Sequence, residues 1–128
     1  MTIDTFEDII AWKKGRELYM GLYSDLKNTK DYSFKDQLLR ATLSITNNIA
    51  EGFDRGSSKE LRQFLIIARG SAAEVRSMLQ INVGLLSDEK TLEYKKLVKD
   101  ISRLLTGFIR ALSLQTTDNR KQKTEDKP

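Results

Sequence analysis

Helical periodicity that no proline interrupts is the feature that most constrains the fold of this chain. Its one proline, Pro128, is the last of 128 residues. Apolar residues recur every three or four positions, which is the spacing of one face of an α-helix, and the alternation and hairpin turns of β-strands are missing. Nothing in the body of the chain therefore breaks a helix sharply. The sequence predicts an all-α protein.

Four blocks show this periodicity, at about residues 8–28, 34–53, 57–86 and 89–114. Ser33 and Ser57 stand where the second and third helices need N-caps, and Glu60 completes a capping box with Ser57. Because the connections are short, we expect residues 1–115 to form an antiparallel up-down-up-down four-helix bundle. Residues 116–128 contain no apolar side chain, so we expect a disordered polar tail. The predicted core stripes of the last two helices are Leu61, Leu65, Ala68, Ala72, Val75 and Leu79, and then Leu97, Ile101, Leu104, Phe108 and Leu112.

Two residue types are absent, and their absence excludes several classes of function. The chain has no cysteine and no histidine, so disulfides, thiolate metal sites and imidazole bases are excluded, and we expect no cofactor. No secretory signal pattern is present, and no apolar run approaches the roughly 20 residues that span a bilayer, which predicts a soluble, cytoplasmic protein without a membrane partner. The net charge of +4 is a mild basic excess, so the placement of charges matters more than their sum.

The stretch NNIAEGFDRG, residues 47–56, gathers polar residues and glycines between the second and third blocks. Gly52 stands where the second helix should end, because glycine adopts the left-handed conformation of a helix end at little cost. Asn48 and Glu51 fall in the last helical turn, where a buried polar group needs a partner. We expect a structural corner with a polar network, and the other interpretation is a ligand pocket at the bundle end. The predicted network residues are Arg40, Asn48, Glu51 and Glu74.

The same region carries a resemblance to a known family. The matching residues are Gln37-Leu-Leu-Arg40-Ala41, Ser44-Ile45, Asn48-Ile-Ala-Glu51-Gly52, Arg55, Glu60, Phe64-Leu65, Ala68, Gly70-Ser71 and Glu74. With Trp12 and an apolar fourth helix, the chain resembles the four-helix-bundle proteins encoded in intervening sequences of bacterial 23S rRNA. That family is similar to the accessory variability protein of diversity-generating retroelements. The resemblance implies a ring of five subunits with a basic surface suited to nucleic acid, and no known catalytic activity.

Basic residues form two rows with a seven-residue spacing. Arg62, Arg69 and Arg76 lie in the third block, and seven residues drift only about 20° around a helix, so they share one face. In the fourth block Lys96, Arg103 and Arg110 repeat this spacing, with Lys99 beside them. Such rows can follow a phosphate backbone, or they can be solvated faces or pair with acids of neighbouring helices. The predicted nucleic-acid-binding residues are Arg55, Lys59, Arg62, Arg69, Arg76, Lys96, Lys99, Arg103 and Arg110.

A second apolar face lies on the third helix, apart from its core stripe. Ile67, Met78, Ile81 and Leu85 widen the apolar arc to about 200°, whereas a single core-facing stripe needs roughly 100°. A subunit interface would cover this face, and we expect a homo-oligomer built through these four residues. The alternative is a helix that sits centrally in its own bundle. The number of five subunits rests on the resemblance alone.

Three functions remain open from the sequence. The leading hypothesis is a non-enzymatic homo-oligomer that binds the backbone of RNA or DNA through its basic rows. The second is a protein-interaction scaffold that docks an acidic partner, such as a reverse transcriptase-type enzyme, without touching nucleic acid. The third is a hydrolase or metal enzyme built on Asn48, Glu51, Asp54 and Glu74, since carboxylates can hold magnesium without histidine. No paired-carboxylate motif supports the third.

Overall fold

Four α-helices make up the fold seen in the computed structural model, which describes the backbone of residues 3–125 and the side chains of residues 3–114. A short 3-10 helix, η1, covers Phe6–Asp8. The helices are α1, Ile10–Leu26; α2, Tyr32–Asp54; α3, Ser58–Ile81; and α4, Asp88–Glu125. No strand occurs among the described residues. The prediction of an all-α fold with four helices is confirmed.

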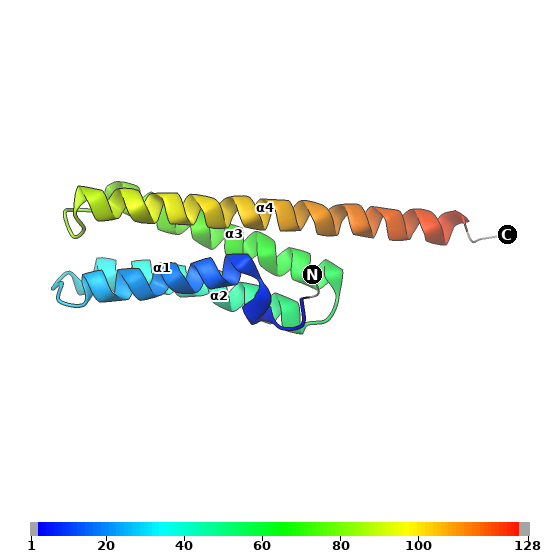
Figure 1. Ribbon diagram of the computed structural model, residues 1–128, viewed down its shortest axis with the longest axis horizontal. Helices are drawn as coiled ribbons and strands as arrows, with labels where there is room; N and C mark the ends of the chain where they lie inside the picture. Colours follow the sequence, from blue (N-terminus) through cyan, green and yellow to red (C-terminus); the bar gives the residue numbers. More distant parts are fainter. Residues whose placement is uncertain (1–2, 126–128) are drawn as a thin grey trace.

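The helices pack as neighbours in chain order. α2 contacts α1 and α3, α3 contacts α4, and α4 returns to contact α1. Figure 1 shows that the chain reverses direction at each connection and that α4 extends past the ends of the other helices. None of the helices formed by the described residues is long and apolar enough to cross a bilayer.

The N-terminal caps explain where α2 and α3 begin. Asp31, rather than the expected Ser33, caps α2: its Oδ1 accepts a hydrogen bond from the backbone N–H of Phe34 at 3.2 Å. An aspartate is as good a cap as a serine, and Asp31 lies two residues before the expected Ser33. Ser57 caps α3 as expected, because its Oγ accepts from the backbone N–H of Glu60 at 3.1 Å.

The C-terminal ends of α3 and α4 differ from the expected boundaries. α3 ends at Ile81, before the expected end at residue 86, because Asn82 adopts the left-handed conformation with φ 49° and Gly84 follows with φ 79°. α4 runs past Leu114 to Glu125, into the segment for which the sequence predicts a disordered tail. No proline stands in this segment before residue 128 to stop the helix. The last three residues and all side chains after residue 114 lie outside the described part.

The core runs along the inner faces of all four helices. Its largest fully buried side chains are Leu18, Leu22 and Leu26 of α1; Leu38, Ile45 and Ile49 of α2; Leu65, Val75 and Leu79 of α3; and Val98, Ile101 and Leu105 of α4. Each such side chain contributes about 1.5–3 kcal/mol through burial. The α3 stripe is buried as predicted except for the half-buried Leu61.

The predicted core stripe of α4 is only partly correct: Ile101 and Leu112 are buried as expected, but the rest of the observed stripe lies on a neighbouring face. Val98, Leu105 and Ile109 are buried, whereas Leu97, Leu104 and Phe108 are half-buried. Leu97 lines the groove between α1 and α4, and residues 104 and 108 share its face of the helix at seven and eleven positions further on. That face lies at the edge of the core, so the stripe centred on Val98 is the one that fills the interior.

Candidate nucleic-acid interface

The charged side chains at the corner between α2 and α3 pair with one another. The Arg55 guanidinium lies 2.9 Å from Glu51 Oε1 and 3.9 Å from Glu60 Oε2, and its Cζ stands 5.2 Å from the centre of the Phe64 ring. Two carboxylates thus compensate this predicted nucleic-acid-binding cation within its own chain. Lys59 is exposed at the start of α3 nearby.

The polar network of this region is smaller than the four residues expected. Asn48 Nδ2 donates to the Ser44 backbone carbonyl at 2.7 Å and to Ser44 Oγ at 3.0 Å. Ser44 Oγ in turn shares a hydrogen bond of 2.8 Å with Ser71 Oγ of α3. Arg40 and Glu74 are exposed, and the hydrogen bonds of the described residues do not join them to Asn48. The network therefore ties α2 to α3 through hydroxyl groups instead of charges.

Hydrogen bonds across α3 and α4 set the register of these two helices. Arg62 Nε donates to Ser113 Oγ at 2.6 Å, and Arg69 Nη1 donates to Thr106 Oγ1 at 3.4 Å. Seven residues forward on α3 thus correspond to seven residues backward on α4, as in an antiparallel pair. The next step places Arg76 opposite Lys99. The α3 row and the Arg103 and Arg110 part of the α4 row consequently meet along the line where α3 and α4 touch.

An open groove of about 440 Å³ lies at this line of contact, and we call it the α3–α4 groove. It is lined by Arg76, Lys99, Ser102, Arg103, Thr106, Gly107 and Arg110. Four of these described residues are cations, and none is a carboxylate. Among side chains 3–114, ion pairs are formed by Arg55 and by Lys90, and none involves a cation of the groove. The positive charge of the groove is therefore not compensated by an ion pair with any of the described side chains.

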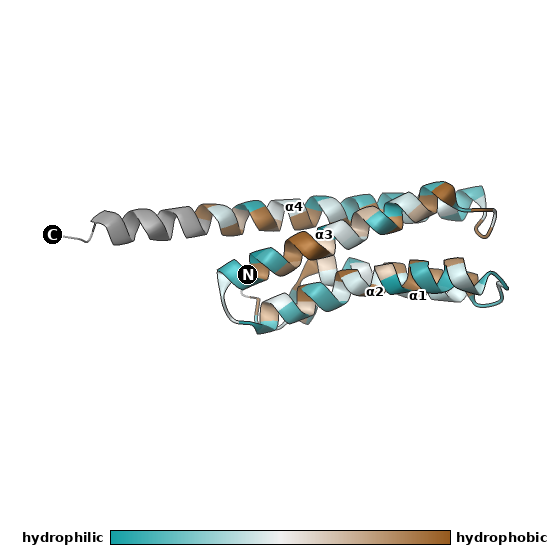
Figure 2. Ribbon diagram, turned by 180° about the vertical axis from the view of Figure 1, so that it is seen from behind, coloured by the Kyte–Doolittle hydropathy of each residue, from teal (hydrophilic) through white to brown (hydrophobic). Residues whose placement is uncertain are grey.

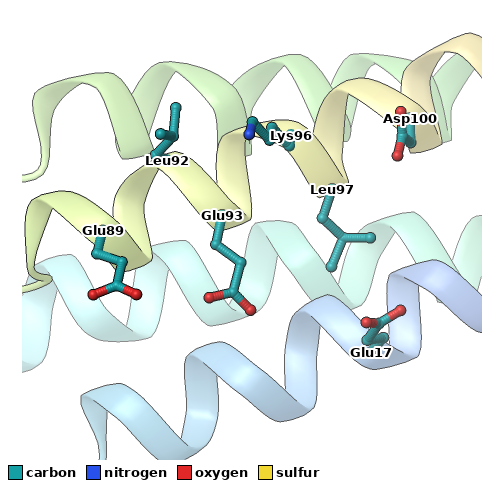
Figure 3. A pocket seen from close by; sticks show the side chains of 7 residues that line it. All are labelled: Glu17, Glu89, Leu92, Glu93, Lys96, Leu97 and Asp100. Carbon is teal, nitrogen blue, oxygen red and sulfur yellow. The ribbon is translucent and has the colours of Figure 1, made fainter.

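A second groove, between α1 and α4, has the opposite charge. It is lined by Glu17, Glu89, Leu92, Glu93, Lys96, Leu97 and Asp100. Figure 3 shows Glu89 and Glu93 extending from α4 on the side of α1, while Lys96 leaves α4 on another side. Among the described residues no group of three or more acidic side chains is arranged to hold a metal ion. Lys96, although predicted as part of the basic row, borders this acidic groove.

A hydrogen bond fixes α1 to α4 beyond this acidic groove. The Tyr94 hydroxyl donates to a carboxylate oxygen of Asp25. Burial raises the pKa of Tyr94, and the hydrogen bond and the negative charge of Asp25 raise it further. Gly21 makes room for this ring, since a Cβ there would lie 2.8 Å from the Tyr94 hydroxyl oxygen. The contact is part of the scaffold on which α4 presents its charges.

Six of the nine predicted nucleic-acid-binding residues come together in one place. Arg62, Arg69, Arg76, Lys99, Arg103 and Arg110 lie along the contact of α3 and α4, whereas Arg55, Lys59 and Lys96 lie elsewhere. Sequence reasoning missed the hydroxyl groups of Ser102, Thr106 and Ser113 that alternate with these cations. Each lies three residues after a basic residue of α4, namely Lys99, Arg103 and Arg110, and this spacing is the signal that points to them.

Of the four residues predicted to form the oligomer interface, two are exposed and two pack in or against the core of their own chain. Ile67 and Ile81 are 53% and 61% exposed, but Met78 is only 6% exposed and belongs to the core of its own chain. Leu85 also packs against that core. Leu43 of α2 and Ile66 of α3 are further apolar side chains, each 37% exposed, and Figure 2 shows a strongly hydrophobic turn within α3.

The sequence of this chain matches the model of a known protein family. The family described as 23S rRNA-intervening sequence protein matches residues 7–107. The chain belongs to this family. The resemblance drawn from its sequence motifs is confirmed. No curated protein matches the chain.

A solved structure shows the same fold as this intervening-sequence protein. It is the crystal structure of a protein with unknown function from the S23 ribosomal protein family of Bacteroides thetaiotaomicron. The TM-score is 0.71 at 22% identity, over 79% of this chain and 96% of that chain. The family match covers Arg76, Lys99 and Arg103 of the α3–α4 groove and ends before Arg110.

Proposed function

We propose that this protein is a non-enzymatic homo-oligomer that binds the phosphate backbone of RNA or DNA through the α3–α4 groove. In this proposal the protomer is an up-down-up-down bundle, and copies of it form a ring. The observation that carries the proposal is the gathering of cations from two helices along one line, with no carboxylate among the described residues that line the groove.

The chemistry of the groove suits phosphate. Guanidinium groups offer several N–H donors in a planar fork that matches phosphate oxygens, and Ser102 and Thr106 add hydroxyl donors of the kind that contact the backbone. Each neutralised phosphate would release counterions and would make binding depend on salt. Nothing in this lining reads a base sequence, so we expect binding without strong sequence preference.

A charge-reversal experiment tests the groove. The change of Arg62, Arg69 and Arg76 to glutamate inverts the charge that α3 contributes along its contact with α4, and we expect RNA affinity at low salt to fall by a factor of about 100 or more. The matched control changes Lys27, Lys30 and Lys59 to glutamate: these lysines are exposed and lie outside the groove, and the net charge changes equally. Fluorescence anisotropy with labelled RNA measures both, and circular dichroism checks the fold. Equal losses in the two variants, or none in the first, would end the proposal.

The oligomer is proposed from the exposed apolar side chains of α2 and α3. Leu43 and Ile67 are exposed side chains that water would contact in a monomer, and a second copy that covered them would remove this apolar surface from water. The ring of five follows the resemblance of the sequence. Light scattering should give a mass near five protomers, and Ile67→Lys should shift it to a lower mass. A monomeric parent protein at working concentration would contradict the ring.

An acidic protein segment is the alternative occupant of the groove, because arginine pairs with carboxylates as well as with phosphates. The repetition of cations along a line favours a polymer whose charges also repeat. Capture of a protein partner that survives nuclease treatment and is lost in the Arg62, Arg69 and Arg76 variant would favour the alternative. Competition of that partner by polyphosphate would show that the two ligands share the groove.

A further inference from the structure

The cations of α3 and α4 interdigitate to form one ladder. Arg62 faces Ser113, and Arg69 faces Thr106. Arg110 and Arg103 each precede these hydroxyl residues by three positions on α4, so each falls between two arginines of α3. The order along the groove is Arg62, Arg110, Arg69, Arg103 and Arg76, with Lys99 beside the last. At about 1.5 Å of rise per residue, the charges stand about 5 Å apart over about 20 Å.

The two sides of this ladder differ in charge. Toward α1 lies the acidic groove, with Glu93 and Asp100 on α4 and Glu17 on α1 (Figure 3). Nucleic acid that extended in this direction would be repelled, because its phosphates would approach carboxylates.

The other side of the ladder is uncharged. Outward on α3 a shallow depression of about 490 Å³ begins at Arg76 itself and continues over Ala73, Ser77, Gln80 and Ile81. Ile66 and Gly70 continue the strip toward the start of the helix, and Glu74 lies further round the helix, away from the ladder. The strip offers small and apolar contacts, one amide and one hydroxyl group.

We propose that the ladder binds one extended strand of nucleic acid, with its phosphates along the arginines and its bases turned over the uncharged strip of α3. This inference rests on the proposed function of the groove and adds the form of the ligand. A single strand needs one line of cations, which the ladder supplies. Its bases need surface that tolerates apolar faces, and Gln80 can hydrogen-bond to base edges that a duplex would hide.

A duplex fits this surface less well. It carries a second line of phosphates, one charge per about 1.7 Å of axis in total. That second line would lie either over the acidic groove, where it is repelled, or over the uncharged strip, where no cation neutralises it. The narrowness of the ladder, rather than its total charge, therefore selects the single strand.

The experiment compares two RNA probes on the full chain. We expect a labelled 20-nucleotide oligouridine to bind at least about ten times more tightly than a 20-base-pair RNA duplex in low salt. For about five phosphates, the logarithm of the single-strand affinity should fall with the logarithm of salt concentration with a slope of about −3.5.

Two variants test the two sides of the ladder separately. The double change Glu93→Lys and Asp100→Lys should raise duplex affinity by about tenfold and single-strand affinity by less than about threefold, because it extends positive charge only where a second strand would lie. Ala73→Glu should lower single-strand affinity by about tenfold, since it sets a charge under the bases. Ala73→Gln is its uncharged control and should bind nearly as the parent does.

The outcomes separate this inference from the proposed function. Duplex binding as tight as single-strand binding, with both lost in the Arg62, Arg69 and Arg76 variant, would overturn the single-strand inference and support the groove. Absence of binding to both probes would overturn both proposals. Unchanged single-strand binding in Ala73→Glu would overturn the placement of the bases on α3.

Discussion

The corner between α2 and α3 and the α3–α4 groove contain the same kinds of residue in opposite states. At the corner, two carboxylates pair with Arg55, and Gly52 is buried with no space around it, because a Cβ would lie 2.5 Å from Phe64 Cβ. In the groove, Arg103 has no ion pair among the described side chains, and a Cβ on Gly107 would meet no atom within 4 Å.

The difference shows how a structural site can be told from a binding site. In the sequence, the corner is the more conspicuous of the two, because its asparagines, glycines and charges are adjacent. Folding satisfies those groups within the chain, and little is left to bind a ligand. The cations of the groove are scattered over two helices, and folding brings them together without an ion pair to any side chain that the structure describes. Charge that remains uncompensated after folding, rather than local concentration of polar residues, marks the candidate site.

The largest effect of a single substitution is expected at Gly52, in the corner between α2 and α3. An alanine there would press its methyl group against Phe64 Cβ, which is fixed to the backbone and cannot rotate away. We expect Gly52→Ala to lower the free energy of unfolding by about 3 kcal/mol through overpacking. Urea denaturation followed by circular dichroism measures this. A stability equal to that of the parent would show that α2 and α3 are not tightly packed at Gly52.

The next effect distinguishes two arginines by what surrounds them. Arg103→Ala should weaken RNA binding by about tenfold at low salt and make the salt slope shallower by about 0.7, because one phosphate contact is lost. Arg55→Ala should leave binding unchanged and lower stability by at most about 1 kcal/mol, since its ion pairs are exposed. Anisotropy titrations at several salt concentrations measure both variants. Equal losses of binding would mean that the groove has no special role.

The order of helices and most of the core could be predicted from the sequence, because both depend on local periodicity. The end of α3 could not, since Leu85 and Leu86 continue the apolar pattern past Asn82. The positive φ angles of Asn82, Val83 and Gly84 reveal the turn. Met78 likewise fits a second apolar face by its position on the helix, but α2 and α4 flank α3 on both sides and leave Met78 in the core.

The candidate site could be predicted only in part. The seven-residue rows are visible in the sequence, but the pairing of Arg69 with Thr106 depends on how two helices dock. Lys96 belongs to the same row as Arg110, yet a drift of about 20° in every seven residues turns it toward the acidic side of α4. The acids of α1 that make this side negative are distant in the sequence. For that reason the boundary between the two charged surfaces appears only in the folded chain.

A smaller effect tests whether the corner's polar network is purely structural. Asn48→Ala removes two hydrogen bonds to Ser44 and should lower the free energy of unfolding by about 1 kcal/mol. RNA affinity should not change. Glu74→Ala is the matched control, because Glu74 is exposed and its loss should change stability by less than about 0.5 kcal/mol. Loss of RNA binding in Asn48→Ala would place function at the corner after all.

The smallest effect is expected at Gly107, the counterpart of Gly52 in the groove. Alanine there meets no atom within 4 Å, and it favours a helix over the unfolded chain. We therefore expect Gly107→Ala to raise the free energy of unfolding by up to about 1 kcal/mol. RNA affinity should stay within about twofold, because phosphates would contact the long arginine side chains rather than the helix backbone. The same urea and anisotropy measurements apply. Destabilisation would mean that α4 is more crowded at this point than the groove implies, and a large loss of binding would mean that the ligand reaches the backbone of α4.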